Sequence, residues 1–139
     1  EAINVFHAKG IKTVVISSTE LGFDGQTGEL TAIASSTTAT LRQAYKIAIP
    51  RFDASFIGTG DLFAALFLAW FTKRDGQLKA TLENVVATLQ AIIRRTFTSA
   101  QKRPGGLKAP ANIELKLIQG RSDILEPIVE IRAEMIKIE

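Results

Sequence analysis

The sequence predicts an α/β domain, and three stretches of the chain carry that prediction. Residues 13–17 form a continuous, mostly β-branched run, which is typical of a parallel strand covered on both faces. Residues 62–71 are apolar on every side, which predicts a short helix buried at the centre of the fold. In residues 78–97 the apolar side chains recur mainly three and four positions apart, which predicts an amphipathic helix of about 20 residues. Glu83 and Gln90 fall outside that apolar stripe.

The expected elements of the N-terminal half are a helix end, a turn and a hairpin. Residues 2–9 have the pattern of the end of an amphipathic helix, with Gly10 as its C-cap. Residues 22–28 are polar and glycine-rich, which predicts a turn. Residues 30–35 and 40–49 are two extended segments, for which a hairpin is the simplest arrangement.

The rest of the chain is expected to complete the same domain. Pro50 ends the second extended segment, and the Pro-Gly-Gly step at 104–106 ends the amphipathic helix. Apolar and polar residues alternate in 113–117, which predicts a half-exposed strand, and in 128–132, which predicts a last edge strand. We find no internal repeat and no linker long enough to divide the chain, so we expect one domain over residues 1–139.

The composition excludes several classes of protein. With 46% hydrophobic residues and a net charge of +3, the chain is too apolar and too weakly charged to be disordered. Its basic residues are scattered, so we expect no nucleic-acid partner. Its longest apolar run is residues 62–71, well short of the roughly 20 residues that a membrane span needs, so we expect no membrane partner. The absence of cysteine excludes disulfides and thiolate chemistry, and it fits a reducing compartment.

The most informative motif is Gly58-Thr59-Gly60-Asp61, which directly precedes the apolar helix. Glycines leave backbone N–H groups unhindered, and such groups at a helix start favour an anion. A phosphate in transfer spreads negative charge over three oxygens, which preorganised donors stabilise. Asp61 is placed to accept the proton of an attacking hydroxyl. The motif therefore predicts a phosphate-transfer site.

Two structural alternatives stay open on the residues alone. The Gly-x-Gly step can be a tight turn and no more, with Asp61 as a helix cap. Ser17 is the last residue of the first expected strand and Ser18 follows it, at the end where ligands bind in open α/β sheets. They can also simply terminate that strand.

The chain resembles the pyridoxal kinases, members of the ribokinase-like superfamily. Their signature is similar to FIGTGDLFAALFLAW, their strand ending in Thr/Ser-Ser is similar to TVVISSTEL, and their C-terminal tail is similar to RTFTSAQK, IELKLIQGRSDI and EPIVEI. The resemblance implies a ribokinase-like, Rossmann-like αβα sandwich, of which residues 1–139 are the C-terminal part of the sheet with flanking helices. The N-terminal part of this single kinase domain would be absent. The start at Glu1 instead of Met, within an expected helix, gives the same expectation of a longer parent chain.

The same resemblance implies a function and its residues. The implied reaction is the ATP-dependent phosphorylation of the 5′-hydroxyl of pyridoxal, and also of pyridoxine and pyridoxamine, in vitamin B6 salvage. Asp61 would deprotonate that hydroxyl and contact the substrate together with Gly58, and the N–H groups of Gly58, Thr59 and Gly60 would form the anion hole. The implied nucleotide-binding residues are Ser17, Ser18, Ile49, Pro50, Arg51, Phe52 and Thr59. Ser17 stands where the family more commonly has threonine.

The implied cofactors and partners follow from that reaction. ATP would carry Mg²⁺ on its phosphates, because the sequence offers no metal-ligand cluster and Mg²⁺ needs few protein ligands. Pyridoxal would be the small-molecule partner, the full-length protein a homodimer, and the location cytoplasmic. Two alternatives stay open: a related kinase for a hydroxymethylpyrimidine or a sugar, and a truncated, non-catalytic nucleotide-binding or interaction fragment. The isolated 139 residues can be inactive even within an active parent, because much of the substrate grip would be missing.

Overall fold

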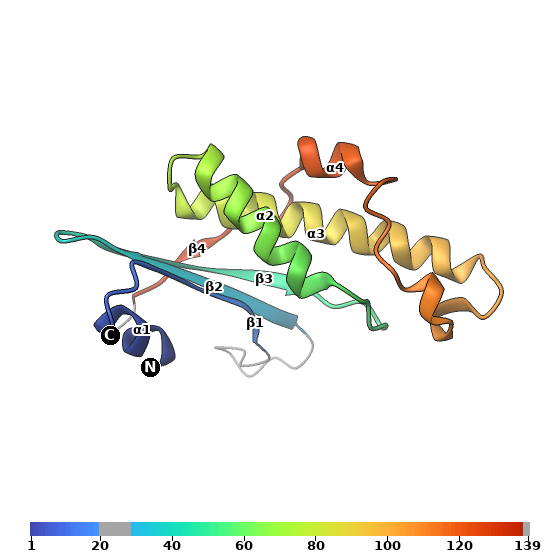
Figure 1. The fold of residues 1–139 in the computed structure, drawn as a ribbon, viewed down its shortest axis with the longest axis horizontal. Coiled ribbons are helices and arrows are strands. Elements are labelled where there is room, and N and C mark those ends of the chain that lie inside the picture. Colours follow the sequence, from blue (N-terminus) through green and yellow to red (C-terminus); the bar gives the residue numbers. More distant parts are fainter. Residues whose placement is uncertain (20–28, 138–139) are drawn as a thin grey trace.

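The computed structural model describes residues 1–19 and 29–137. The expected turn at 22–28 lies outside the described residues. The elements follow one another along the chain as drawn in Figure 1. They are α1 (Ala2–Ala8), β1 (Thr13–Thr19), β2 (Glu29–Thr37), β3 (Arg42–Pro50), α2 (Thr59–Lys73), α3 (Leu78–Gln101), the 3₁₀ turns η1 (Gly106–Lys108) and η2 (Pro110–Asn112), α4 (Arg121–Leu125) and β4 (Glu134–Met135).

The strands form a four-stranded sheet in the order β1-β2-β3-β4, and each described pairing is antiparallel. The hairpin expected from the sequence is confirmed, since β2 pairs with β3 from Glu29↔Pro50 to Thr37↔Arg42. Its turn is closed by Thr38, whose N–H donates to the carbonyl of Leu41 at 2.8 Å. The parallel pairing expected for residues 13–17 is not found among the described strands. β1 is covered by α2 on one side and α1 on the other, but its partner β2 runs antiparallel to it.

Helices cover both faces of the sheet. Figure 1 shows α2 and α3 on one face and α1 on the other. Because side chains alternate along a strand, β2 and β3 send one set toward α2 and α3, where it forms the core. This set comprises Ala32, Ala34, Tyr45, Ile47 and Ile49. On the opposite face, the Nε2 atom of His7 in α1 lies 2.9 Å from the hydroxyl oxygen of the fully buried Ser35.

Helix α3 is the centre of the packing, as its apolar stripe predicts. Leu82, Val85, Val86 and Ile92 are completely buried. The helix continues past the last stripe residue to Gln101 and ends before the Pro-Gly-Gly step at 104–106, as expected. It is more enclosed than the stripe indicates, because Glu83 and Gln90, which lie outside the stripe, are buried as well.

Helix α2 is less enclosed than the sequence predicts. Phe63, Leu66 and Trp70 are buried against α3 and the sheet, but the opposite side of the helix is exposed. Leu68 on that side is 69% exposed. The expected central burial is therefore wrong for the described chain, since α3 and the sheet cover only one face of α2.

The C-terminal segment differs most from the expected strands. Residues 113–117 form no strand apart from a single parallel bridge between Ile57 and Glu114. Residues 128–132 are not a strand either; the edge strand is the shorter β4, which pairs Met135 with Tyr45 and Glu134 with Lys46. Both alternating segments instead pack apolar side chains, Leu115 and Ile131, on the core. The alternating pattern thus reflects apolar side chains that contact the core, although the two segments do not pair as strands.

In the part of the chain that the structure describes, no helix combines the length and the apolar character that crossing a membrane requires.

Candidate phosphate-transfer site

The start of α2 supplies a group of backbone N–H donors. Gly58 caps the helix with φ +88°, a left-handed conformation that favours glycine. The first α2 amide with a helical acceptor is that of Leu62, which donates to the Gly58 carbonyl at 3.0 Å. Within the described residues, the amides of Thr59, Gly60 and Asp61 have no backbone acceptor, as expected for a first helical turn. The donors and the helix dipole together make this end of α2 suited to an anion.

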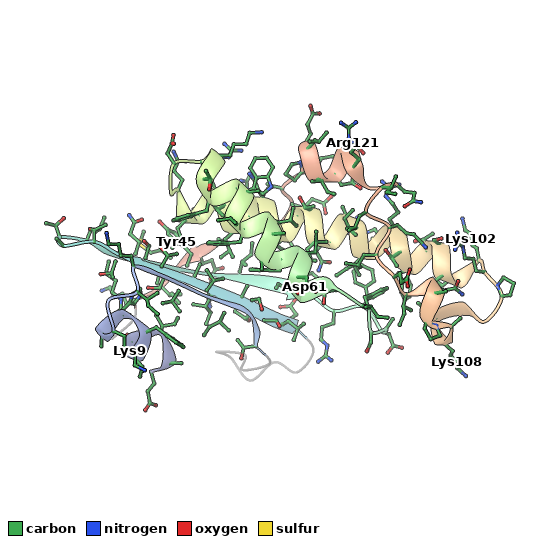
Figure 2. All side chains as sticks on the ribbon, viewed as in Figure 1. Lys9, Tyr45, Asp61, Lys102, Lys108 and Arg121 are labelled. Carbon is green, nitrogen blue, oxygen red and sulfur yellow. The ribbon has the colours of Figure 1, made fainter. Side chains whose placement is uncertain are left out.

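Asp61 lies in the first turn of α2, where Figure 2 labels it. Its side chain is exposed, and no hydrogen-bond or ion-pair partner is found for it in residues 1–19 and 29–137. It lies next to Gly60, which lines the site cavity, although Asp61 and Gly58 are not among the lining residues. The carboxylate is thus exposed at the start of α2, one residue after the last glycine of the motif.

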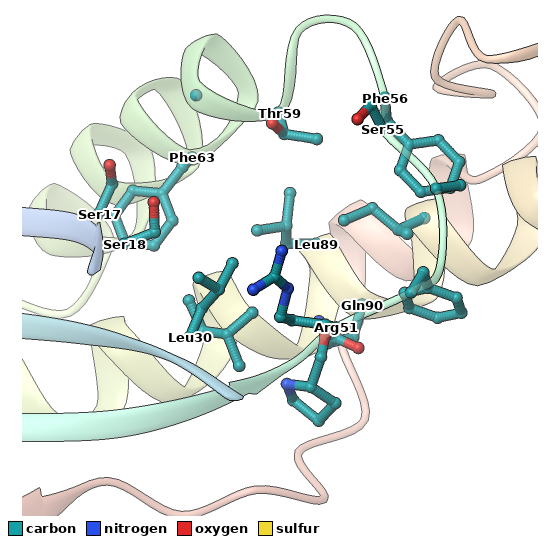
Figure 3. Close-up of a pocket in the computed structure, with 16 residues that line it drawn as sticks. Ser17, Ser18, Leu30, Arg51, Ser55, Phe56, Thr59, Phe63, Leu89 and Gln90 are labelled. Carbon is teal, nitrogen blue, oxygen red and sulfur yellow. The ribbon is translucent and has the colours of Figure 1, made fainter. Parts of the chain in front are cut away.

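A cavity of about 310 Å³ opens beside these amides (Figure 3). It is at the lower end of the range for ligand pockets. The ends of β1 and β3, the loop after β3 and the start of α2 form its walls. Of the residues that the sequence assigned to the nucleotide and the anion, it gathers Ser17, Ser18, Ile49, Pro50, Arg51, Phe52, Thr59 and Gly60.

Ser17 and Ser18 both reach this cavity because β1 is irregular there. In a regular strand two adjacent side chains point to opposite faces. The pairing runs from Ile16↔Ile33 to Thr19↔Thr31, so three steps on β1 match two on β2, which is a β-bulge. Figure 3 shows the two serines side by side at the end of the strand, facing the start of α2. Local sequence gives no signal for the bulge.

Arg51 is the one charged residue among the lining residues that the structure describes. Figure 3 shows its guanidinium turned toward the middle of the cavity. Two contacts hold the loop that carries Arg51 on α3. The centroids of the Phe52 and Phe97 rings lie 5.5 Å apart, and the Gln90 side-chain amide donates to the Pro50 carbonyl at 3.1 Å. A cation beside open amides is an environment for a polyphosphate.

Several lining residues were not anticipated from the sequence. Leu89 and Ile93 belong to the apolar stripe of α3, which the sequence analysis assigned only to the core. Ser55 and Phe56 lie in the loop before the glycine motif. Gln90 lies outside the apolar stripe, yet it is buried against the cavity. In the sequence, Gln90 lies four positions after Val86 and three before Ile93, and this spacing places it on the same side of the helix as those two apolar residues.

No group of three or more His, Asp or Glu side chains that could hold a metal ion is present among the described residues. The side-chain oxygens among the described lining residues are the serine and threonine hydroxyls and the Gln90 amide oxygen, and the exposed Asp61 follows the lining residue Gly60 in the chain. Such a donor set suits a hard cation that keeps waters and phosphate oxygens as ligands.

Comparisons with known proteins agree with this arrangement. No family model matches the chain. Among curated proteins, the pyridoxal kinase of Sus scrofa is 37% identical over 141 residues, which is 96% of this chain and 44% of the relative. The pyridoxal kinase of Arabidopsis thaliana is 39% identical over 136 residues, with 96% of this chain and 42% of the relative covered. The chain thus spans less than half the length of the curated relatives it matches.

Solved structures give the fold class. The pyridoxal kinase of Leishmania donovani in complex with ADP and pyridoxine superimposes with a TM-score of 0.79 at 25% identity, over 98% of this chain and 43% of that one. A putative phosphomethylpyrimidine kinase of Bacteroides thetaiotaomicron shares the fold with a TM-score of 0.72 at 19% identity. The fold is therefore the ribokinase-like α/β class expected from the sequence. Within that class, almost the whole chain is similar in sequence to part of the pyridoxal kinases.

Proposed function

We propose that the chain is the C-terminal part of a pyridoxal kinase domain, which transfers the γ-phosphate of ATP to the 5′-hydroxyl of pyridoxal and of the related alcohols pyridoxine and pyridoxamine. The observation that carries the proposal is the first turn of α2. Its Thr59 and Gly60 line a cavity that also collects Ser17, Ser18 and Arg51, and the exposed Asp61 follows them in the same turn. The homology to pyridoxal kinases and the ADP and pyridoxine named for a structural relative support this substrate pair.

In the proposed reaction, Asp61 takes the proton of the 5′-hydroxyl as general base. The oxygen then forms a bond to the γ-phosphorus while the bond from that phosphorus to the β,γ-bridging oxygen breaks, and ADP leaves. The N–H groups of Gly58, Thr59 and Gly60 donate to the oxygens of the transferring group. Mg²⁺ carried on ATP would neutralise phosphate charge. Ser17, Ser18, Thr59 and the segment from Ile49 to Phe52, with Arg51, hold the nucleotide.

Asp61 fits the role of base by position. It has no partner among the described residues, so its lone pairs are open to a substrate hydroxyl. In the proposal the nucleotide fills the cavity, and the alcohol binds outside it, at the start of α2 where Asp61 is exposed. Gly58, also outside the lining, would contact that alcohol from the same side.

Three finer expectations belong to the same proposal and rest on the resemblance. Residues 1–139 would be the C-terminal part of a single kinase domain, and the full-length protein would be a cytoplasmic homodimer. A hydroxymethylpyrimidine is the second candidate acceptor, favoured by the fold shared with a putative phosphomethylpyrimidine kinase.

The test is phosphate transfer from ATP to pyridoxal by the full-length protein, with Asp61→Asn and Asp75→Asn compared. Asp75 lies just beyond the other end of α2, with φ +50°, a conformation that asparagine tolerates. We expect Asp61→Asn to lower kcat by about 10²–10⁴-fold and to leave the affinity for Mg-ADP within about twofold, while Asp75→Asn matches the wild type. Near-normal turnover by Asp61→Asn would overturn the assigned base. Phosphorylation of a hydroxymethylpyrimidine or a sugar but of no B6 vitamer would overturn the substrate, and no transfer to any of them would favour a non-catalytic fragment.

A further inference from the structure

Gln90 holds a backbone atom at the edge of the candidate site. It lies on α3, is 7% exposed, and donates from Nε2 to the carbonyl oxygen of Pro50 at 3.1 Å. Pro50 is the last residue of β3, so the chain leaves the sheet at this carbonyl. A buried amide side chain is costly to keep unless it is hydrogen-bonded. The bond to Pro50 satisfies a donor that would otherwise be buried on α3 without a partner.

The segment after Pro50 is fastened to α3 at two points, one on each side of Arg51. The first is the hydrogen bond from Gln90 to Pro50, and the second is the contact of the Phe52 ring with the Phe97 ring. Gln90 and Phe97 lie seven residues apart, so they lie on the same side of α3. Arg51 between the two fastenings sends its guanidinium into the cavity (Figure 3).

The segment after Pro50 borders a second cavity, so packing alone does not hold it in position. A second cavity of about 480 Å³ lies on its other side, between α3 and the C-terminal segment that includes Ile128 and Ile131. Pro50, Arg51, Phe52 and Gln90 line both cavities, so together they form the wall that separates them. Without the bond to Pro50, the wall has room to retreat into the second cavity.

We propose that Gln90 is a positioning residue for nucleotide binding: it fixes Pro50, and through Pro50 the Arg51 segment that forms one wall of the nucleotide cavity. The inference rests on the proposed function, since it takes the 310 Å³ cavity to be the nucleotide site. Gln90 takes no part in proton or phosphate transfer. Its removal therefore acts on nucleotide affinity and not on the chemical step.

The test compares Gln90→Met with Thr88→Val in the full-length protein. Methionine has nearly the length of glutamine but no donor. Thr88 is a matched control, because it is also buried on α3 and its hydroxyl donates to a backbone carbonyl, that of Asp123, at 3.1 Å, without lining the nucleotide cavity. The probe is Mg-AMP-PNP, titrated by calorimetry. For Gln90→Met we expect Kd and the KM for ATP to rise roughly 3- to 10-fold, the span of one hydrogen bond, with kcat and the KM for pyridoxal unchanged. For Thr88→Val we expect no change in any of these.

Amide hydrogen exchange of residues 51–54 provides the second measurement, which needs no nucleotide. We expect faster exchange there in Gln90→Met and unchanged exchange in Thr88→Val. Nucleotide affinity retained in a folded Gln90→Met overturns the inference and leaves the proposed function standing, as does an equal loss of affinity in Thr88→Val. If Gln90→Met does not fold, Gln90→Glu, which keeps the shape and sets an acceptor against the Pro50 carbonyl, takes its place with the same expectations. A wild-type protein that binds no Mg-AMP-PNP overturns both the proposed function and this inference.

Discussion

The carboxylate of Glu83 accepts a hydrogen bond of 3.0 Å from the backbone N–H of Ala133, although 50 residues separate them in the chain. A second bond of 3.2 Å comes from the guanidinium of Arg132. Both Glu83 and Ala133 are buried. This contact ties the C-terminal segment to α3 immediately before β4 joins the sheet, and therefore sets where the edge strand begins.

Replacing Glu83 by alanine is expected to lower the free energy of unfolding by about 1–3 kcal/mol, because the buried N–H of Ala133 loses its acceptor. The measurement is urea denaturation, together with hydrogen exchange at Ile136, whose N–H donates to the Ala44 carbonyl. The control is Glu130→Ala. Its side chain is 70% exposed and lies 4.0 Å from Arg94, so we expect a cost within about 0.5 kcal/mol. Equal costs for the two variants would contradict the importance given to the buried contact.

Gly120 and Ile92 form a second contact that depends on a missing side chain. A Cβ atom on Gly120 would overlap the end of the Ile92 side chain and lie 3.2 Å from the Lys116 carbonyl oxygen. The backbone of Gly120 has φ −96°, which any residue adopts, so the restriction is one of packing alone. We expect Gly120→Ala to cost about 1–3 kcal/mol of stability, measured as a lower urea midpoint at unchanged slope.

The double variant Gly120→Ala with Ile92→Val tests whether the overlap with Ile92 causes this cost. Valine lacks the Cδ1 atom that the new methyl group would meet. Ile92→Val alone costs about 0.5–1.5 kcal/mol. The double variant should cost less than the sum of the two single variants, because the residues are in contact. Strict additivity would show that the backbone near Lys116, and not Ile92, resists the alanine.

We expect that glycine is needed at positions 58 and 60 for different reasons. Gly58 has φ +88°, so Gly58→Ala should lower stability by about 1–2 kcal/mol through backbone strain. Gly60 lies within the first turn of α2, and no atom lies within 4 Å of an added Cβ, so Gly60→Ala should not destabilise the protein. The methyl group would nevertheless obstruct the approach of a phosphate to the amides. We expect kcat/KM to fall by about 10²-fold in Gly60→Ala, measured beside its thermal unfolding. Full activity in that variant would place the transferred phosphate elsewhere.

The sequence predicted those parts of the site that depend on residues close together in the chain. The Gly58–Asp61 motif starts a helix, as its glycines and its position before an apolar run indicate. The serine pair lies near the end of β1, which continues by one residue to Thr19, as a polar step after a β-branched run indicates. Gln90 could not be recognised, because its role depends on where Pro50 lies, 40 residues earlier in the chain. Contacts of that sequence separation arise from topology and leave no local pattern.

The errors in the fold have the same origin. A β-branched run predicts a strand, but the direction of its partner depends on how the chain returns, and β2 returns antiparallel to β1. Alternation in residues 113–117 predicts a strand, but the segment is held by side chains instead. Asn112 donates to the carbonyls of Pro104 and Gly106, and the Lys116 N–H donates to the Thr96 hydroxyl. The bonds of Asn112 fix the chain just before the segment, and the bond to Thr96 occupies the Lys116 N–H, which a strand partner would otherwise accept from.

Helix α2 offers the last prediction, since its sequence is apolar all round while its burial is one-sided. Leu66 is 5% exposed and Leu68 is 69% exposed. In the 139-residue chain, Leu66→Ala should cost about 2–5 kcal/mol of unfolding free energy, and Leu68→Ala should change it by no more than about 0.5 kcal/mol. Urea denaturation of both variants at several protein concentrations measures this difference. A cost for Leu68→Ala that grows with concentration would mean that chains associate through this face of α2, because burial of Leu68 would then require a second molecule.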